Sequence, residues 1–308
     1  MTRRFLDCSA SQLASLDKAA LLHALKASEG RVLVSETIVA VQPLLFDVTN
    51  AELAASQGAD LLLLNLFDAD QPMIRGMPEG GSPEETIRDL QRLTGRVIGV
   101  NLEAVDPEHE VNDDEFWRVC PGRAATAGNA RRLAEMGARF LVLTGNPANG
   151  VSNRAINHSL KEIREEVGDR LVLMTGKMHS AGIVRESGMG ILSCVDVEDF
   201  VANGADVVLL PAPGTVPGMS VETAQGLISH AHRLGVLAMT AVGTSQEGAD
   251  IETIRRIALM SKMAGADLHH IGDTGYLGIA LPENILAYGI AIRGIRHTYA
   301  RIARSINR

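Results

Sequence analysis

The stretch Gly204-Ala-Asp206, followed at once by Val207-Val-Leu-Leu210, decides the fold class because variants of it recur along the whole chain. In each variant a helix-like stretch ends at a glycine, and a short apolar run follows within a few residues. Close copies begin at Gly58, Gly137 and Gly265, and looser copies begin at Gly30, Gly95, Gly168 and Gly235.

Each part of this phrase has a structural meaning. Glycine at the end of a helix adopts the left-handed conformation that is costly for other residues. An apolar run without alternation is typical of a parallel strand that is covered on both faces. Between the runs lie amphipathic stretches such as residues 129–136 and 251–260, in which apolar residues are three and four apart. The phrase therefore predicts repeated helix–strand units.

Eight apolar runs start near residues 31, 60, 96, 139, 170, 206, 236 and 267, about 30 to 43 residues apart. Eight such units in about 250 residues match a (β/α)8 TIM barrel. An open doubly wound sheet shows the same alternation, but no Gly-x-Gly-x-x-Gly follows the first run. We expect one barrel domain over residues 1–308. Residues 1–29 would form an N-terminal helical cap, with one helix from Ser9 to Ala27 under the barrel that residues 30–308 form.

Composition narrows the class of protein. The 308 residues are 46% apolar and 3% aromatic, and the formal net charge is −8, which does not suit a nucleic-acid binder. Residues 1–8 lack the apolar stretch of a signal peptide, and no apolar run approaches the roughly 18 residues of a membrane helix. Cys8, Cys120 and Cys194 are far apart and fit neither a disulfide framework nor a zinc site. We expect a soluble cytoplasmic protein without a nucleic-acid or membrane partner, and a homo-oligomer stays open.

The active site of such a barrel lies where the strands end, in the loops that follow them. Polar side chains occur after most of the predicted strands, and we expect substrate contacts from Asn65, Asn101, Asn146 and His270. His269 and His270 are adjacent, so at most one of them faces into the barrel.

Four further side chains at these positions suit acid–base chemistry: Glu36, Glu103, Lys177 and His179. A carboxylate that faces a lysine or histidine can remove and return a proton next to a carbonyl group. We expect Lys177 and Glu103 to be the acid–base pair, and Glu36 and His179 to orient the substrate. An imine formed by Lys177, a polar substrate contact and a solvated loop lysine remain open for that residue.

The loops after the last two strands are candidates for anion binding, because barrels often hold phosphate there and small residues let backbone N–H groups point at an anion. The expected contacts are Gly243, Thr244, Ser245, Gly272, Asp273, Thr274 and Gly275. The carboxylate of Asp273 argues against a phosphate at this place.

Metal binding is a third expectation. Asp68 and Asp70, with the two glutamates named above, offer the oxygen ligands that Mg²⁺ prefers. No spacing supports a zinc site. We expect no required cofactor, with Mg²⁺ as an option.

Several phrases of the chain, among them Leu63-Leu-Asn-Leu-Phe-Asp68 and His270-Ile-Gly-Asp-Thr-Gly-Tyr276, resemble an uncharacterised bacterial TIM-barrel family. The resemblance extends over nearly the whole chain and implies the barrel fold without a substrate. Members are sometimes labelled haloacid-dehalogenase-like hydrolases or phosphoenolpyruvate-mutase-like proteins. The barrel is more distantly similar to phosphosugar epimerases such as N-acetylmannosamine-6-phosphate epimerase.

The residues do not support either label. Asp68-Ala-Asp70 imitates the Asp-x-Asp motif of haloacid-dehalogenase-type phosphatases, but Gln71-Pro72 follows it and it lies after the second strand instead of the first. The Lys-Lys-Cys-Gly-His motif of the mutase superfamily is absent from the sequence.

These observations predict an enzyme that acts on a small anionic, phosphorylated sugar or carbonyl substrate by abstracting a proton next to a carbonyl. The reaction would be that of an isomerase, an epimerase or an aldolase. The alternatives are a Mg²⁺-dependent phosphatase-like hydrolase that uses Asp68 and Asp70, and a metabolite-binding barrel without catalysis.

Overall fold

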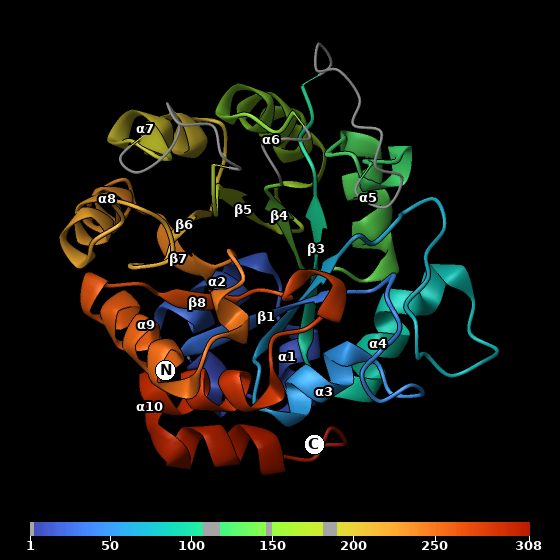
Figure 1. Ribbon diagram of the computed structural model, residues 1–308. Helices are drawn as coiled ribbons and strands as arrows, with labels where there is room; N and C mark the ends of the chain where they lie inside the picture. The colour runs from blue at the N-terminus through green and yellow to red at the C-terminus, as the bar shows by residue number, and fades with distance from the viewer. Residues whose placement is uncertain (1–2, 107–117, 146–149, 181–189) are drawn as a thin grey trace.

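The computed structural model describes residues 3–106, 118–145, 150–180 and 190–308, and within them eight parallel strands close into a barrel. Neighbouring strands pair in chain order, and β8 pairs with β1. Helices alternate with the strands and surround the barrel (Figure 1). The predicted (β/α)8 fold is therefore confirmed.

The strands start within two residues of the positions that the apolar runs predict. They are β1 (Val32–Ile38), β2 (Leu61–Asn65), β3 (Val97–Leu102), β4 (Phe140–Leu143), β5 (Val172–Gly176), β6 (Val207–Pro211), β7 (Leu237–Val242) and β8 (Leu268–Ile271).

The helices between them begin at capping residues that the sequence supplies. For example, the Ser152 and Asp250 side chains accept hydrogen bonds from the first turns of α6 and α9. Gly265 ends α9 with a φ of +98°. Across the described residues, no helix combines the length and the apolar character that a membrane span requires. The helices are α1 (Ala10–Ser15), α2 (Lys18–Lys26), α3 (Asn50–Ser56), α4 (Thr86–Thr94), α5 (Ala127–Met136), α6 (Asn153–Val167), α7 (Cys194–Ala202), α8 (Val221–Arg233), α9 (Ile251–Ala264) and α10 (Pro282–Ala303).

Side chains along each strand alternate between two apolar cores. Val34, Leu63 and Met174 pack inside the barrel, whereas Leu33 and Leu62 pack between the strands and the helices. This alternation continues past the strand ends, and it decides which polar side chains reach the barrel mouth.

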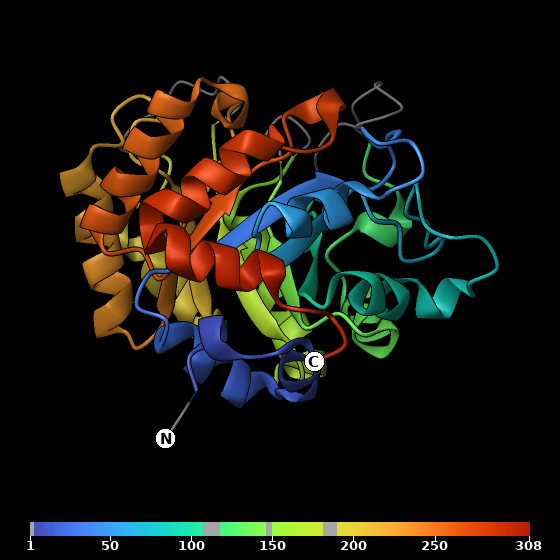
Figure 2. The same ribbon diagram turned by 90° about the horizontal axis from the view of Figure 1, so that it is seen from below.

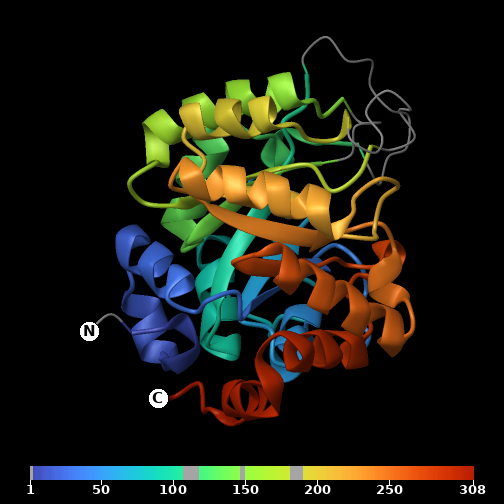
Figure 3. The same ribbon diagram turned by 90° about the vertical axis from the view of Figure 1, so that its left-hand side faces the viewer.

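The N-terminal cap differs from the expected single helix between Ser9 and Ala27. Leu16 has an extended backbone, and the Asp17 side chain accepts a hydrogen bond from the Ala20 N–H, so that a second helix begins at Lys18. The cap therefore consists of α1 and α2. Both pack against the interior core at the N-terminal end of the barrel, opposite the loops that follow β7 and β8 (Figure 3).

The aspartates of the Gly-Ala-Asp phrase have a function that the pattern does not reveal. Each one precedes a strand, and its carboxylate accepts the backbone N–H of a residue on the strand before. The bonds run from Leu33 to Asp60 at 2.8 Å, from Leu173 to Asp206 at 2.8 Å and from Ala238 to Asp267 at 2.9 Å. They add a side-chain hydrogen bond to three strand pairs at the N-terminal end.

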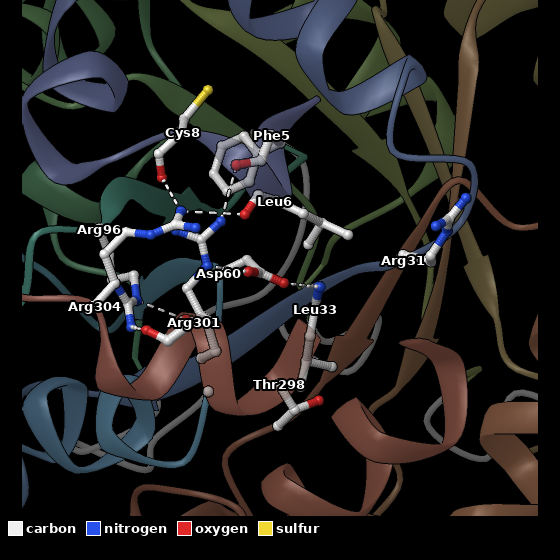
Figure 4. Close-up of polar contacts among 12 residues, drawn as sticks. Phe5, Leu6, Cys8, Arg31, Leu33, Asp60, Arg96, Thr298, Arg301 and Arg304 are labelled. Carbon is white, nitrogen blue, oxygen red and sulfur yellow. Dashed lines mark hydrogen bonds and ion pairs between the residues drawn. The ribbon is translucent and has the colours of Figure 1, made fainter. Parts of the chain in front are cut away.

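Asp60 is fully buried and also binds two arginines of α10 (Figure 4). Arg293 and Arg301 each form an ion pair with its carboxylate, at 2.8 Å for Arg301. Arg301 additionally donates to the Phe5 carbonyl at 2.9 Å and its guanidinium lies over the Phe5 ring. Helix α10 bends at Gly294, so Arg293 and Arg301 come from separate segments of it (Figure 2). The buried carboxylate therefore joins the N-terminal segment, β1 and the last helix.

We expect Asp60→Asn to reduce the free energy of unfolding by about 3–5 kcal/mol, because it leaves two guanidinium groups buried without a counter-charge. Urea denaturation followed by circular dichroism measures this loss. Asp267→Asn is the matched control, since Asp267 also bonds a strand N–H but pairs with the half-exposed His232. Equal losses for the two variants would contradict the importance of the buried ion pairs.

Candidate functional site

The C-terminal ends of the strands enclose a cavity of about 310 Å³, referred to below as the mouth cavity. It is lined by Glu36, Asn65, Leu66, Asn101, Glu103, Arg123, Thr144, Gly145, Met178, His179, Gly243, Ser245, Glu247, Gly272, Asp273 and Gly275. Its position agrees with the rule that barrel enzymes use this end.

Strand alternation explains why these side chains meet. Glu36 is two residues beyond the interior Val34, and Asn65 is two residues beyond the interior Leu63. Glu36 lies within β1, which continues to Ile38, and not in a loop after a shorter strand as the sequence suggested. Its carboxylate is consequently held by a rigid strand and is 5% exposed.

The two adjacent histidines of β8 face opposite sides, as predicted. His270 is buried on the inner side, where its Nε2 lies 2.9 Å from Glu36 Oε2. Because an ionised carboxylate only accepts, Nε2 carries the proton of this hydrogen bond. His269 faces outward and contacts the Gly30 carbonyl at 3.1 Å, and burial lowers its pKa to about 4.

A chain of hydrogen bonds crosses the mouth cavity from β3 to the loop after β8. Asn101 donates to Asn65 Oδ1 at 3.3 Å, and Asn65 donates to Asp273 Oδ2 at 2.9 Å. The Leu66 N–H also donates to Asn65 Oδ1 at 2.9 Å, which fixes the orientation of both amides.

Asp273 is the titratable group in this series of hydrogen bonds. Burial raises the pKa of its carboxyl to about 7, and the nearby charge of Glu36 adds to the effect. The bonds from Asn65 and from the Gly275 N–H oppose the rise, but neither brings a positive charge. A carboxyl group in this range exchanges protons readily at neutral pH.

The loops after β7 and β8 were expected to bind an anion, and the residues contribute unequally. Gly243, Ser245, Gly272, Asp273 and Gly275 line the mouth cavity, whereas Thr244 and Thr274 are not among its lining residues. The Thr244 hydroxyl donates to the Thr215 carbonyl at 2.9 Å.

Glu247 occupies part of the space that an anion would need in these loops. It is 3% exposed, lines the mouth cavity and accepts the Thr274 N–H at 3.1 Å. Burial raises the pKa of this carboxyl. The loops therefore present two carboxyl groups, Glu247 and Asp273, beside the backbone N–H groups.

His179 and Lys177 follow β5 directly. His179 lines the mouth cavity, and burial together with the charge of Lys177 lowers its pKa against the opposing charge of Glu36, which favours the neutral imidazole. Lys177 is 3% exposed. It is not among the residues that line the mouth cavity, although the next two residues, Met178 and His179, are. Of the three alternatives left open for Lys177, the solvated loop lysine disagrees with the structure, because the side chain is buried.

Glu103 lines the mouth cavity as expected, but its buried carboxylate forms an ion pair with Arg123. Arg123 is the one arginine or lysine in the lining that the described residues form. The lining also includes four carboxyl groups, those of Glu36, Glu103, Glu247 and Asp273. The mouth cavity is therefore acidic.

Asp68 and Asp70 lie outside this lining. Asp68 Oδ1 accepts the Asp70 N–H at 2.8 Å, its Oδ2 contacts Cys120 Sγ at 3.2 Å, and Asp70 pairs with Arg132. These contacts favour a structural role for both carboxylates. In the residues that the structure describes, no three histidine, cysteine or acidic side chains are grouped as a metal site would require. Asn146, the remaining predicted contact, lies outside the described residues.

Sequence reasoning missed Arg123, Thr144 and Glu247. Thr144 directly follows β4, and its position two residues beyond the interior Val142 would have indicated it. Arg123 and Glu247 come from short 3-10 helices within loops, and no periodic pattern marks such residues.

Comparison with known proteins agrees with the fold. The chain is similar to the crystal structure of a candidate lyase/mutase from Burkholderia cenocepacia J2315, with 14% identity, a TM-score of 0.50, and coverage of 86% of this chain and 84% of that chain. It also resembles thiamine phosphate pyrophosphorylase from Pyrococcus furiosus, with 9% identity, a TM-score of 0.48 and coverage of 86% and 96%. The similarity to the Burkholderia protein supports the barrel fold alone. No protein of curated function matches the sequence.

The sequence also matches one family model, described as a domain of unknown function, over residues 6–308. The protein therefore belongs to the DUF7916 family.

Proposed function

We propose that this protein is an acid–base enzyme that moves a proton at the carbon next to a carbonyl group of a small polar substrate. The observation that carries the proposal is the carboxyl group of Asp273, which lines the mouth cavity and whose pKa is raised to about 7. General acid–base catalysis is most efficient when the pKa of the catalytic group lies near the working pH.

The proposed reaction needs no reactant other than the substrate. Ionised Asp273 removes the proton from the carbon beside the carbonyl, and the electrons of the C–H bond form a carbon–carbon double bond. The carbonyl oxygen becomes an enolate, which neutral His179 stabilises by donating a hydrogen bond. Asp273 then returns the proton. Return to the neighbouring carbon is aldose–ketose isomerisation, provided that His179 gives its proton to the enolate oxygen and takes the proton of the adjacent hydroxyl group.

Glu36 is a positioning residue in this scheme. Glu36, Asp273 and His179 all line the mouth cavity, and the charge of Glu36 raises the pKa of the other two. The hydrogen bond to His270 holds the Glu36 carboxylate in place on β1. Removal of the Glu36 charge would lower the pKa of Asp273 and weaken it as a base.

This assignment differs from the acid–base pair that the sequence suggested. Glu103 is neutralised by Arg123, and Lys177 is absent from the lining of the mouth cavity. A role of Lys177 in imine formation, and hence aldol cleavage, stays a prediction.

We expect Asp273→Asn to slow proton exchange at least about 100-fold, because the amide cannot accept the proton. The measurement is incorporation of deuterium from D2O into a panel of aldoses, ketoses, keto acids and sugar phosphates, read by mass spectrometry. Asp70→Asn is the matched control, since this exposed aspartate lies outside the mouth cavity. Undiminished exchange in Asp273→Asn would refute the assignment.

The pH dependence provides a second test. We expect kcat/KM of the wild type to rise with pH through a value near 7, because the base must be ionised. Glu36→Gln should move this rising limb to lower pH, since the charge of Glu36 raises the pKa of Asp273. If the rising limb of kcat/KM stays at the same pH in Glu36→Gln, a group other than Asp273 controls it.

A third test concerns stability. The folded protein holds a proton on Asp273 up to a pH of about 7, whereas the ordinary pKa of an aspartate carboxyl group is 3.8, so the folded state binds more protons between these values. Stability is therefore lost as pH rises from about 4 to 7. Asp273→Asn removes this loss, and its stability relative to wild type should increase by up to about 4 kcal/mol between pH 4 and pH 8. Urea midpoints at the two pH values measure it, and a constant difference would contradict the raised pKa.

A further inference from the structure

A second cavity lies at the N-terminal end of the barrel, away from the mouth cavity. It has a volume of about 670 Å³ and is lined by Glu29 and Arg31, which precede β1, by Lys262 near the end of α9, and by residues 290–297 of α10. The bend of α10 at Gly294 therefore forms one of its walls. We refer to this cavity as the α10 groove.

The charged side chains that line the α10 groove are mostly basic. Among the described residues of its lining, Glu29 is the one acidic side chain, and there are five basic ones: Arg31, Lys262, Arg293, Arg296 and His297. The buried carboxylate of Asp60 compensates the charge of Arg293. Three cations then face one carboxylate, which leaves an excess of two positive charges even with a neutral histidine. The chain as a whole has the opposite sign, with a formal net charge of −8.

The weaker bases of the groove are affected by this positive charge. Burial lowers the pKa of Lys262, and the charge of Arg31 lowers it further. Burial also lowers the pKa of His297, three arginine charges add to the effect, and Asp7 opposes it; the arginines are Arg296, Arg4 and Arg31. Arg296 donates a hydrogen bond to His297 Nε2 at 3.1 Å, so this ring nitrogen carries no proton. The cations therefore repel one another, and an anion in the groove would relieve the repulsion.

The contacts that these cations make within the protein do not use up their donors. Arg31 pairs with Glu29, whose side chain is 72% exposed, so that water screens this ion pair. Lys262 donates to the Ile292 carbonyl. A guanidinium group has five N–H donors and an ammonium group has three, so both side chains retain donors for a ligand.

The bend adds exposed backbone to the same groove. Gly294 has a φ of +75° and a ψ of 167°, a conformation that is essentially restricted to glycine. A Cβ atom at this position would meet no other atom within 4 Å, so the space in front of the backbone is open. The helical segment that starts after Gly294 has its first N–H groups at this place, and they add to the positive potential of the side chains.

We propose that the α10 groove binds a small phosphorylated metabolite, whose phosphate monoester group is held by Arg31, Lys262 and Arg296. Such a group carries about two negative charges at pH 7 and has three acceptor oxygens, which matches the excess charge of the groove. Guanidinium groups bind phosphate oxygens through two parallel N–H bonds. Ile290 and Ile295 also line the groove and would contact the organic part of the ligand.

This site is separate from the proposed catalytic one. The α10 groove and the mouth cavity have no lining residue in common, and they lie at opposite ends of the strands. The volume of the groove lies within the usual range for small-molecule sites. The proposal therefore does not depend on the proposed function.

Binding is tested by isothermal titration calorimetry with a panel of sugar phosphates and nucleoside monophosphates, including glucose 6-phosphate and AMP. Glucose and adenosine are the uncharged counterparts, and sulfate at the same ionic strength is the control for unspecific anion binding. We expect at least one ester to bind at least tenfold more tightly than its uncharged counterpart and than sulfate. Binding of no ester in the panel, or equal binding of sulfate, would overturn the proposal.

Arg296→Gln tests where the ester binds. The Arg296 side chain is exposed and contacts His297, so the variant should keep its melting temperature without ligand, while the affinity for the ester falls about tenfold or more. Arg255→Gln is the matched control, since it removes the same charge from an exposed position of α9 outside the groove and should leave the affinity unchanged. Lys262→Gln, on the other wall, should also weaken binding. Unchanged affinity in Arg296→Gln would place the ester elsewhere on the protein and contradict the proposal.

His297 provides a local readout of the bound anion. A phosphate group beside it favours the protonated ring, so the ester that binds should raise the pKa of His297 in an NMR titration. His297→Gln identifies the signal, and the exposed His158 of α6, whose pKa should not change, is the internal control. If an ester binds and the pKa of His297 stays the same, the α10 groove is not its site.

Discussion

The carboxylate of Asp60 accepts the Leu33 N–H and binds both Arg293 and Arg301, and the closed barrel depends on this kind of contact. Two other aspartates make similar contacts. The Asp206 carboxylate forms an ion pair with Lys18 of α2 at 2.6 Å, and the Asp267 carboxylate lies 2.7 Å from His232 of α8. Each of these aspartates thus adds a bond between neighbouring strands and attracts a basic side chain from an outer helix. The contacts lie at the N-terminal end, so they stabilise the barrel without using residues of the mouth cavity.

The aspartates at the two ends of the barrel have opposite electrostatic surroundings. Asp60 is surrounded by guanidinium groups, whose charge compensates for the lost hydration. Asp273 is partly buried, an amide and a backbone N–H are its bonding partners, and the negative charge of Glu36 raises its pKa further. Without a cation the carboxyl keeps its proton up to about pH 7. The difference lies in the partners, because the residue type is the same.

The sequence predicted the barrel and much of its mouth because both depend on local patterns. Apolar runs located the strands to within two residues, and alternation placed His270 inside and His269 outside. The break between α1 and α2 depends on one capping residue, Asp17, and a periodic pattern does not resolve it.

The chemical roles of the site residues were harder to predict because they depend on contacts between distant parts of the chain. The sequence suggested Glu103 and Lys177 as an acid–base pair, but Glu103 forms an ion pair with Arg123, and Lys177 is buried outside the lining of the mouth cavity. Asp273 appeared in the sequence only as an obstacle to phosphate, since its pKa follows from burial and from Glu36 on another strand. Composition at the strand ends therefore located the mouth cavity better than it predicted the contacts of the residues that line it.

Unbonded atoms are informative only where rotation cannot satisfy them. Ser35 and Ser261 have buried hydroxyl groups without a partner among the described residues, but a hydroxyl hydrogen can turn toward a distorted or distant acceptor. The oxygens of Asn101 and Glu247 have no such freedom, because the other half of each side chain is already bonded. No hydrogen bond among the described residues offsets the desolvation of these two oxygens.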